Sequence, residues 1–227
     1  RRGSVHLIHN FMTLGTAARR AAVRMQEPCR VIAIGRLIEK KGFDYLVRAV
    51  DLLRKMDRKV LLTIVGSGVQ MHALRRETAR LGLEGHVSFA GALPHDRIAG
   101  LLAESDMLVM PSVVPAGTEK SDGLPTVITE AMSMGVPVVS TDVASISDVV
   151  KDGETGRLVA QKDERALADA MASLMDDREN ALRMADNAMK LVNSMLSEEN
   201  TLARMEHLFR SHSAAAAEHP KAESSER

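Results

Sequence analysis

Residue types that mark several classes of protein are scarce in this chain of 227 residues. It has no tryptophan, one tyrosine and four phenylalanines, too few for the aromatic platforms on which proteins stack single-stranded nucleic acid. Lysine plus arginine balance aspartate plus glutamate at 30 each, so the chain as a whole generates no basic field. We therefore expect no nucleic acid among its partners.

Cysteine and long apolar runs are nearly absent as well. The single Cys29 excludes a disulfide framework within the chain and cannot supply a cysteine metal cluster, so a small buried side chain is its expected role. No apolar run approaches the length of a membrane span, and the N-terminus has no signal-peptide apolar region. A reducing, cytoplasmic setting fits best. The chain begins with Arg-Arg-Gly rather than Met, which suggests a part of something longer.

What the sequence does contain is an alternation of short β-branched runs with amphipathic stretches. Strands are predicted at 4–10, 30–36, 59–66, 86–91, 106–112, 136–141 and 156–160. Helices are predicted between them at 43–56, 69–82, 95–105, 125–134 and, shorter, 145–150. Because strands separated by helices form right-handed βαβ units, we predict an α/β fold with a Rossmann-like, doubly wound parallel sheet.

The last part of the chain has a different pattern. From residue 164 it becomes all helical, with helices predicted at 164–177, 178–193 and 197–212. Residues 213–227 lack apolar periodicity and are predicted to be a disordered tail.

Ligands of open parallel sheets bind outside the carboxyl ends of the strands. Arg36 ends one predicted strand and Lys41 follows five residues later, so the two cations could hold a diphosphate. The alternative is a solvated charged loop. The turn Gly66, Ser67 and Gly68 could bring backbone amides close to a phosphate, but it lacks the third glycine of a dinucleotide fingerprint and the lysine of a P-loop. Taken alone, it favours a tight strand-to-helix turn.

The segment from Asp122 to Gly135 combines a predicted helix with two carboxylates. Val127, Ile128, Ala131, Met132 and Met134 fall on one helix face, and Thr126, Thr129, Glu130 and Ser133 fall on the other. Pro125 suits the first helical position and Gly135 the residue beyond the end. The amides of Gly123 and Leu124 precede the helix and carry positive dipole character. An anion or a sugar hydroxyl bound there is about as well supported as an ordinary solvated helix face.

The combination of four segments favours a binding site over an ordinary helix face. These segments occur in the chain in the order 35–46, 64–68, 87–112 and 122–159. Together they resemble the C-terminal, nucleotide-sugar-binding domain of retaining GT-B glycosyltransferases of group 1 (family 4). The resemblance covers about Val31 to Leu174 and implies one half of a GT-B fold with a helical C-terminal end. It implies that Arg36 and Lys41 bind the donor diphosphate and that Gly66, Ser67 and Gly68 form the glycine-rich loop beside the donor. It also implies that the backbone near Leu93 meets the nucleobase.

The same resemblance assigns the segment before and within the later helix. It implies that the amides of Gly123 and Leu124 lie near the donor phosphate and sugar, and that Glu130 is the second glutamate of the family's Glu-x7-Glu motif, bonded to the ribose. Asp122 stands where the first glutamate is usual, and its side chain is one methylene shorter, although it is still the group expected on the donor sugar. The resemblance implies neither a metal nor another cofactor.

The resemblance also implies that the acceptor-binding half of the fold is missing from this chain, because GT-B proteins carry their acceptor site in an N-terminal half. We expect residues 1–28 to be a remnant of the interdomain connection, 29–175 the donor domain and 176–212 C-terminal helices that return toward the missing half, leaving an apolar face exposed. The expected function is transfer of a hexose, with retention, from a nucleotide-diphosphate sugar to a glycan or lipid-linked acceptor, with membrane-peripheral association of the full protein as an option. The alternatives are a non-catalytic, donor-domain-like module that pairs with a separate chain, and a related GT-B epimerase or phosphorylase.

Overall fold

The computed structural model describes residues 27–117, 123–196 and 206. The predicted strand at 4–10, the carboxylate of Asp122, all but one residue of the predicted helix at 197–212 and the predicted tail lie outside the described residues. One compact unit contains the described residues up to Val192, and those from Asn193 onward belong to a second unit. The description below concerns the first unit.

The described residues of this unit form a parallel sheet of six strands in the order β3-β2-β1-β4-β5-β6. The strands are β1 (Cys29–Ile34), β2 (Val60–Val65), β3 (Val87–Gly91), β4 (Met107–Met110), β5 (Val138–Thr141) and β6 (Arg157–Val159). The chain adds strands outward from β1 to β3, then returns to place β4 on the other side of β1. This doubly wound, Rossmann-like order confirms the predicted fold class, and its direction reverses between β1 and β4.

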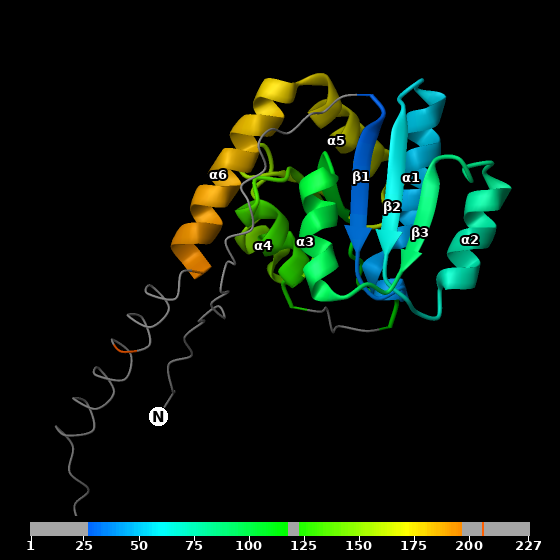
Figure 1. Cartoon of the computed structure of the whole chain (residues 1–227), viewed down its shortest axis with the longest axis horizontal. Coiled ribbons are helices and arrows are strands. Elements are labelled where there is room, and N and C mark those ends of the chain that lie inside the picture. Colours follow the sequence, from blue (N-terminus) through cyan, green and yellow to red (C-terminus); the bar gives the residue numbers. More distant parts are fainter. Residues whose placement is uncertain (1–26, 118–122, 197–205, 207–227) are drawn as a thin grey trace, which may run out of the picture. The chain divides into compact units, whose positions relative to one another are not determined.

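Helices cover both faces of the sheet (Figure 1). They are η1 (Glu39–Lys41), α1 (Phe43–Lys55), α2 (Met71–Arg80), α3 (His95–Glu104), α4 (Thr126–Ser133), η2 (Ala144–Asp148), α5 (Glu164–Asp176) and α6 (Arg178–Leu196). In Figure 1, α1 and α5 lie on one face of the sheet, and α3 and α4 lie on the other. Because side chains alternate along a strand, Val31 and Ala33 join the core under α1 and α5, while Ile32 is buried outside that cluster.

The helix α1 shows how the apolar pattern fixes the core. The predicted stripe of Phe43, Leu46, Val47, Val50 and Leu53 is fully buried, as expected for residues spaced three and four apart on one helix face. Each such side chain contributes about 1.5–3 kcal/mol when it is removed from water. The position of α1, and with it the loop that precedes it, is therefore set by apolar burial.

Two predicted helix starts are displaced for local reasons. The helix α2 begins at Met71 rather than Val69, because the Gln70 amide bonds to the Leu37 carbonyl (3.0 Å) and Val69 is left 87% exposed in the loop. The helix α4 begins at Thr126, one residue after Pro125, whose ψ of 122° is extended. Both displacements lengthen the loops at the carboxyl edge of the sheet.

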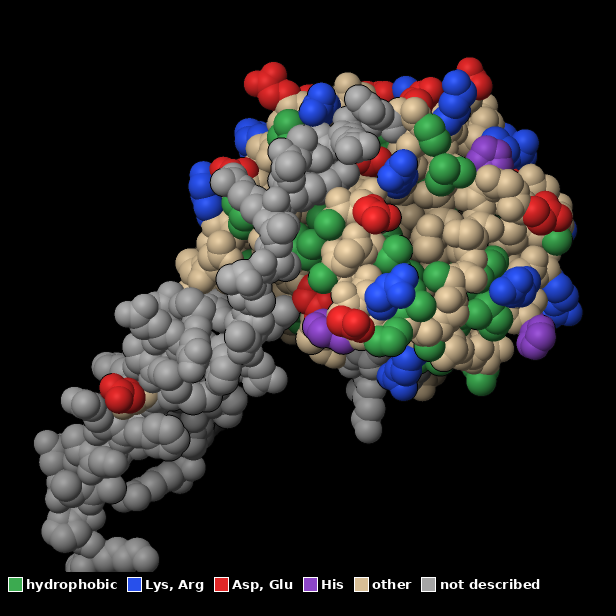
Figure 2. Space-filling model, viewed as in Figure 1, with side chains coloured by type: hydrophobic (Ala, Val, Ile, Leu, Met, Phe, Trp, Pro, Cys, Tyr) green, Lys and Arg blue, Asp and Glu red, His purple; other side chains and the backbone are tan. Residues whose placement is uncertain are grey.

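The apolar sides of the first two terminal helices are largely buried. Leu167, Met171 and Leu174 of α5 are buried, and so are Ala181 and Met184 of α6, all within the core cluster that also contains the apolar face of α1. Leu182 of α6 is 38% exposed and the third predicted helix lies almost wholly outside the described residues, so the exposed apolar face of the terminal helices stays a prediction. Over the described face seen in Figure 2, side chains of both charges are interspersed, in keeping with the balanced composition.

Candidate functional site

The point where the strand order reverses brings two loops together. The short helix η1 follows β1, and residues 111–113 follow β4. The Val113 amide donates to the Lys40 carbonyl at 2.9 Å, which ties the two loops directly. Gly42, at φ 62°, lies so close that a Cβ atom there would stand 2.0 Å from the Pro111 carbonyl oxygen. The lysines of η1 are thereby held against the end of β4.

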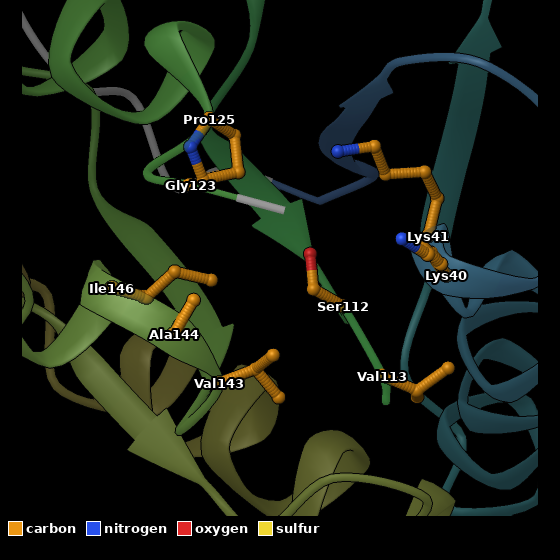
Figure 3. A pocket seen from close by; sticks show the side chains of 9 residues that line it. All are labelled: Lys40, Lys41, Ser112, Val113, Gly123, Pro125, Val143, Ala144 and Ile146. Atoms are coloured by element: carbon orange, nitrogen blue, oxygen red, sulfur yellow. The ribbon is translucent and has the colours of Figure 1, made fainter. Parts of the chain in front are cut away.

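A pocket opens at this junction, with about 220 Å³ of empty space, part of it open to solvent (Figure 3). Its walls come from η1, from the end of β4, from the residues before α4 and from η2 with the residue before it. The lining residues are Lys40, Lys41, Ser112, Val113, Gly123, Pro125, Val143, Ala144 and Ile146. The described lining carries two cations, Lys40 and Lys41, which suit an anion.

Ser112 supplies the polar floor of the pocket. Its side chain is buried, with 6% of its surface exposed, yet its Oγ has no hydrogen-bond partner among the described residues. Its carbonyl accepts a hydrogen bond of 2.5 Å from Thr141 Oγ1 on the neighbouring strand, which fixes the backbone. Figure 3 shows the hydroxyl pointing into the space flanked by Lys41 and by Gly123 and Pro125.

The end of α4 nearest the pocket is also electropositive. The residue before the helix is Pro125, whose own side chain makes no capping hydrogen bond. The first amides of a helix have no partner within it and carry a partial positive charge. The lysines, the helix end and the unpartnered hydroxyl therefore converge on one small volume.

The glycine turn after β2 lies at the same edge of the sheet. A Cβ atom on Gly66 would stand 1.9 Å from the Gly35 carbonyl oxygen, and one on Gly68 would stand 2.4 Å from that of Leu37. The Leu37 amide in turn donates to the Ser67 carbonyl at 2.9 Å. Close packing against the loop after β1 is thus a sufficient reason for both glycines, and their contact with a donor stays a prediction.

Four other predicted site residues do not line the pocket. Arg36 is exposed at the end of β1, and Leu93 is half-buried after β3. Leu124 and Glu130 are half-buried, Leu124 just before α4 and Glu130 within it. Of the predicted set, the structure brings Lys41 and Gly123 together in the pocket, and the roles of the remaining residues stay predictions.

One assignment on α4 is wrong. Thr129 was expected on the polar face, but it is 2% exposed, and its Oγ1 donates to the Thr126 carbonyl at 2.7 Å. Because the hydroxyl is satisfied inside the helix, the side chain can be buried without loss of a hydrogen bond. The predicted apolar face, including Ile128 and Ala131, is buried as expected.

Several lining residues were not predicted from the sequence, namely Lys40, Val113, Val143, Ala144 and Ile146. The rule that ligands bind beyond the carboxyl ends of strands does point to Ser112, which directly follows Pro111 at the end of β4. Lys40 is adjacent to Lys41 but was not predicted as a site residue. No sequence signal places the residues before and within η2, because only the pairing of β5 with β4 brings them there.

Cys29 is buried at 1% exposure, as its sequence context predicted. Within the residues that the structure describes, no group of three or more His, Cys, Asp or Glu side chains is placed to hold a metal ion. The described helices include none with the length and apolarity that crossing a membrane requires.

A cationic pocket at the point where the strand order of a Rossmann-like sheet reverses is typical of domains that bind anions and nucleotides. Within that class, the family "Glycosyl transferases group 1" matches residues 16–191, which is more than half of the chain. The chain belongs to that family, as the resemblance had implied.

Known proteins extend the comparison. A GDP-mannose-dependent alpha-(1-6)-phosphatidylinositol monomannoside mannosyltransferase of Mycobacterium tuberculosis is 29% identical over 196 residues, 86% of this chain and 51% of that protein. The chain thus spans about half the length of the curated relatives that it matches.

Solved structures show the same fold. Anabaena HepE, in complex with UDP and glucose, superimposes with a TM-score of 0.71 at 24% identity, over 80% of this chain and 48% of HepE. The C-terminal domain of a group 1 glycosyl transferase, LpcC, from Francisella tularensis does so with a TM-score of 0.66 at 21% identity, over 75% of this chain and 87% of that domain. The fold is therefore that of one domain of GT-B glycosyltransferases.

Proposed function

We propose that this chain is the donor-binding domain of a retaining glycosyltransferase, which transfers a hexose from a nucleotide-diphosphate sugar to a glycan or lipid-linked acceptor. The observation that carries the proposal is the pocket of Lys40, Lys41, Ser112 and Gly123 at the strand-order reversal, in a chain that belongs to the glycosyl transferases group 1 family. A diphosphate matches its cationic lining. The mannosyltransferase relative is named for GDP-mannose, and the HepE structure contains UDP, which supports a nucleotide sugar as donor.

In this proposal, different residues bind different parts of the donor. Lys41 and Arg36 bind the diphosphate, while the amides of Gly123 and Leu124 and the α4 terminus offset the charge that grows on it as the sugar leaves. Glu130 accepts hydrogen bonds from the ribose, Asp122 does so from the donor sugar, and the backbone near Leu93 meets the base. Charge stabilisation by these groups takes the place that a metal ion has in other transferases.

In this proposal, the acceptor binds to a part of the protein that lies outside this chain. Because the chain spans 51% of the mannosyltransferase relative, the other half of such a protein supplies the acceptor site. The chain alone is then expected to bind a nucleotide but to transfer no sugar. Addition of that half, as part of one polypeptide or as a second chain, is expected to restore transfer.

Calorimetry with the full 227-residue chain tests the proposal. The chain is titrated with UDP, GDP and ADP, and we expect at least one of them to bind. Lys41→Ala is expected to weaken that nucleotide about tenfold, since a charge-assisted hydrogen bond contributes about 1.5–3 kcal/mol. Glu130→Ala is expected to weaken it by a similar factor through the ribose.

Lys190→Ala is the matched control. Lys190 lies on α6 and pairs with Asp186 at 2.7 Å on the surface, so its loss removes a lysine without touching the pocket. Its nucleotide affinity is expected to equal that of the wild type. A folded chain that binds none of the three diphosphates at millimolar concentration would favour the non-catalytic module instead.

A further inference from the structure

The hydroxyl of Ser112 is unusual among the buried hydroxyls of this protein. Ser140 Oγ donates to the Met110 carbonyl at 2.7 Å, Thr141 Oγ1 to the Ser112 carbonyl at 2.5 Å and Thr155 Oγ1 to the Val149 carbonyl at 2.6 Å. Ser112 Oγ is as inaccessible as these but has no partner among the described residues. Burial of an unpaired hydroxyl destabilises a folded protein, so its position needs a reason other than packing.

The surroundings of this hydroxyl indicate what its partner is. It points into the pocket between Lys41 and the residues that precede α4 (Figure 3). The described lining contributes two lysines, and the adjacent helix end is electropositive. A hydroxyl in such a field completes its hydrogen bonding best as the donor to an anionic oxygen. Among the described residues, Gln70 Oε1 is the other buried side-chain atom without a hydrogen-bond partner, and Gln70 does not line the pocket.

The backbone around Ser112 is also held in place. Its carbonyl is bonded to Thr141, and the next amide, that of Val113, donates to the Lys40 carbonyl. The hydroxyl is thus presented from a strand end that is anchored on both sides. Donors fixed in advance lose little freedom on binding, which is the condition for an efficient oxyanion contact.

We propose that the Ser112 hydroxyl donates a hydrogen bond to a phosphate oxygen of the donor diphosphate, from below the pocket and between the lysines and the α4 terminus. This inference rests on the proposed function for the identity of the ligand. It makes Ser112 a binding residue whose unpaired state weakens the empty domain and is relieved when the diphosphate binds.

Ser112→Ala is the variant that tests this, and Ser140→Ala is its matched control on the neighbouring strand. Ser112→Ala removes a hydroxyl with no partner, so its thermal midpoint without ligand is expected to equal or exceed that of the wild type. Ser140→Ala removes the bonded hydroxyl and is expected to lower the midpoint. Each variant is then titrated with the nucleoside diphosphate that binds, with its hexose derivative and with inorganic pyrophosphate.

We expect Ser112→Ala to weaken the diphosphate and pyrophosphate about tenfold, while Ser140→Ala leaves both affinities unchanged. Equal affinity of Ser112→Ala and wild type overturns the inference, and so does a loss confined to the hexose derivative, which would place the hydroxyl on the sugar. If the wild type binds pyrophosphate through Ser112 but no nucleoside diphosphate, the proposed function fails and the phosphate contact stands. A folded wild type that binds neither ligand overturns both.

Discussion

Substitution of Gly42 by alanine is the most direct test of how the pocket is held together. Gly42 has φ 62°, in the left-handed region, and its missing Cβ faces the Pro111 carbonyl oxygen at 2.0 Å and Val113 Cγ1 at 3.1 Å. The first of these neighbours is backbone in a buried segment, so it cannot rotate away. The new methyl must therefore push η1 from the end of β4 by about an ångström or more before it reaches ordinary contact distance.

The cost can be worked out from these contacts. The left-handed conformation costs an alanine about 1–2 kcal/mol. Separation of the two loops breaks the hydrogen bond from the Val113 amide to the Lys40 carbonyl, which contributes about 1 kcal/mol and leaves buried groups unpaired. With some loss of packing around Pro111, we expect Gly42→Ala to lower the free energy of unfolding by about 3–4 kcal/mol, a large part of the ~5–15 kcal/mol typical of a domain.

Urea denaturation at equilibrium measures this loss, and Gly82→Ala is the control. Gly82 has φ 66°, almost the same conformation, but a Cβ atom there would meet nothing within 4 Å. The control should therefore lose only the conformational part, about 1–2 kcal/mol. If the two variants lose equal stability within about 0.5 kcal/mol, the close approach of Gly42 to Pro111 contributes nothing and the reasoning is refuted.

Two further predictions concern the core and the charges. Ile128 is fully buried on α4, so Ile128→Ala should lower the unfolding free energy by about 2–5 kcal/mol in urea melts, whereas Thr126→Ala on the exposed side of the same helix should change it by less than about 0.5 kcal/mol. Burial raises the pKa of Asp51, but hydrogen bonds and charge from Lys55 and Arg54 outweigh it and hold the pKa below 3.8. The stability from this carboxylate is therefore present above pH 3.8 and lost as pH falls through the lower folded-state pKa, and Asp51→Asn should make the acid side of the stability profile shallower. An unchanged profile would show that other carboxylates dominate acid unfolding.

The features predicted best are those set by repetition along the sequence. The apolar stripe of α1 follows the period of a helix, and the runs of β1 and β2 are short, rich in β-branched residues and bounded by turn residues, so their positions followed from the residues. The doubly wound parallel sheet followed from the alternation of strands and helices and from the resemblance of the motifs, whereas the order of its strands was not predicted. Lys41 and Gly123 could be expected near one another because both follow features at the same edge of the sheet.

The features missed depend on single interactions that the apolar pattern does not encode. Thr129 is buried because its hydroxyl bonds within α4, an option that a helix projection does not represent. Val69 is excluded from α2 because Leu37, on a different strand end, binds the neighbouring amide. Ser112 could be located at a strand end from the sequence, but its lack of a hydrogen-bond partner follows only from the packing of β4 beside β5 and η1.

The loops after β1, β2 and β3 are joined to one another through their backbones. Leu37 N–H donates to Ser67, Gln70 N–H donates to Leu37, and Gly66 N–H donates to the Gly91 carbonyl at 2.7 Å. Since these bonds join backbone atoms, the exposed side chains of the rim take no part in holding its shape. Ser67 and Val69, both exposed, can therefore be randomised in a mutant library without disturbing the scaffold. The rim offers a natural place to redirect the choice of donor by engineering.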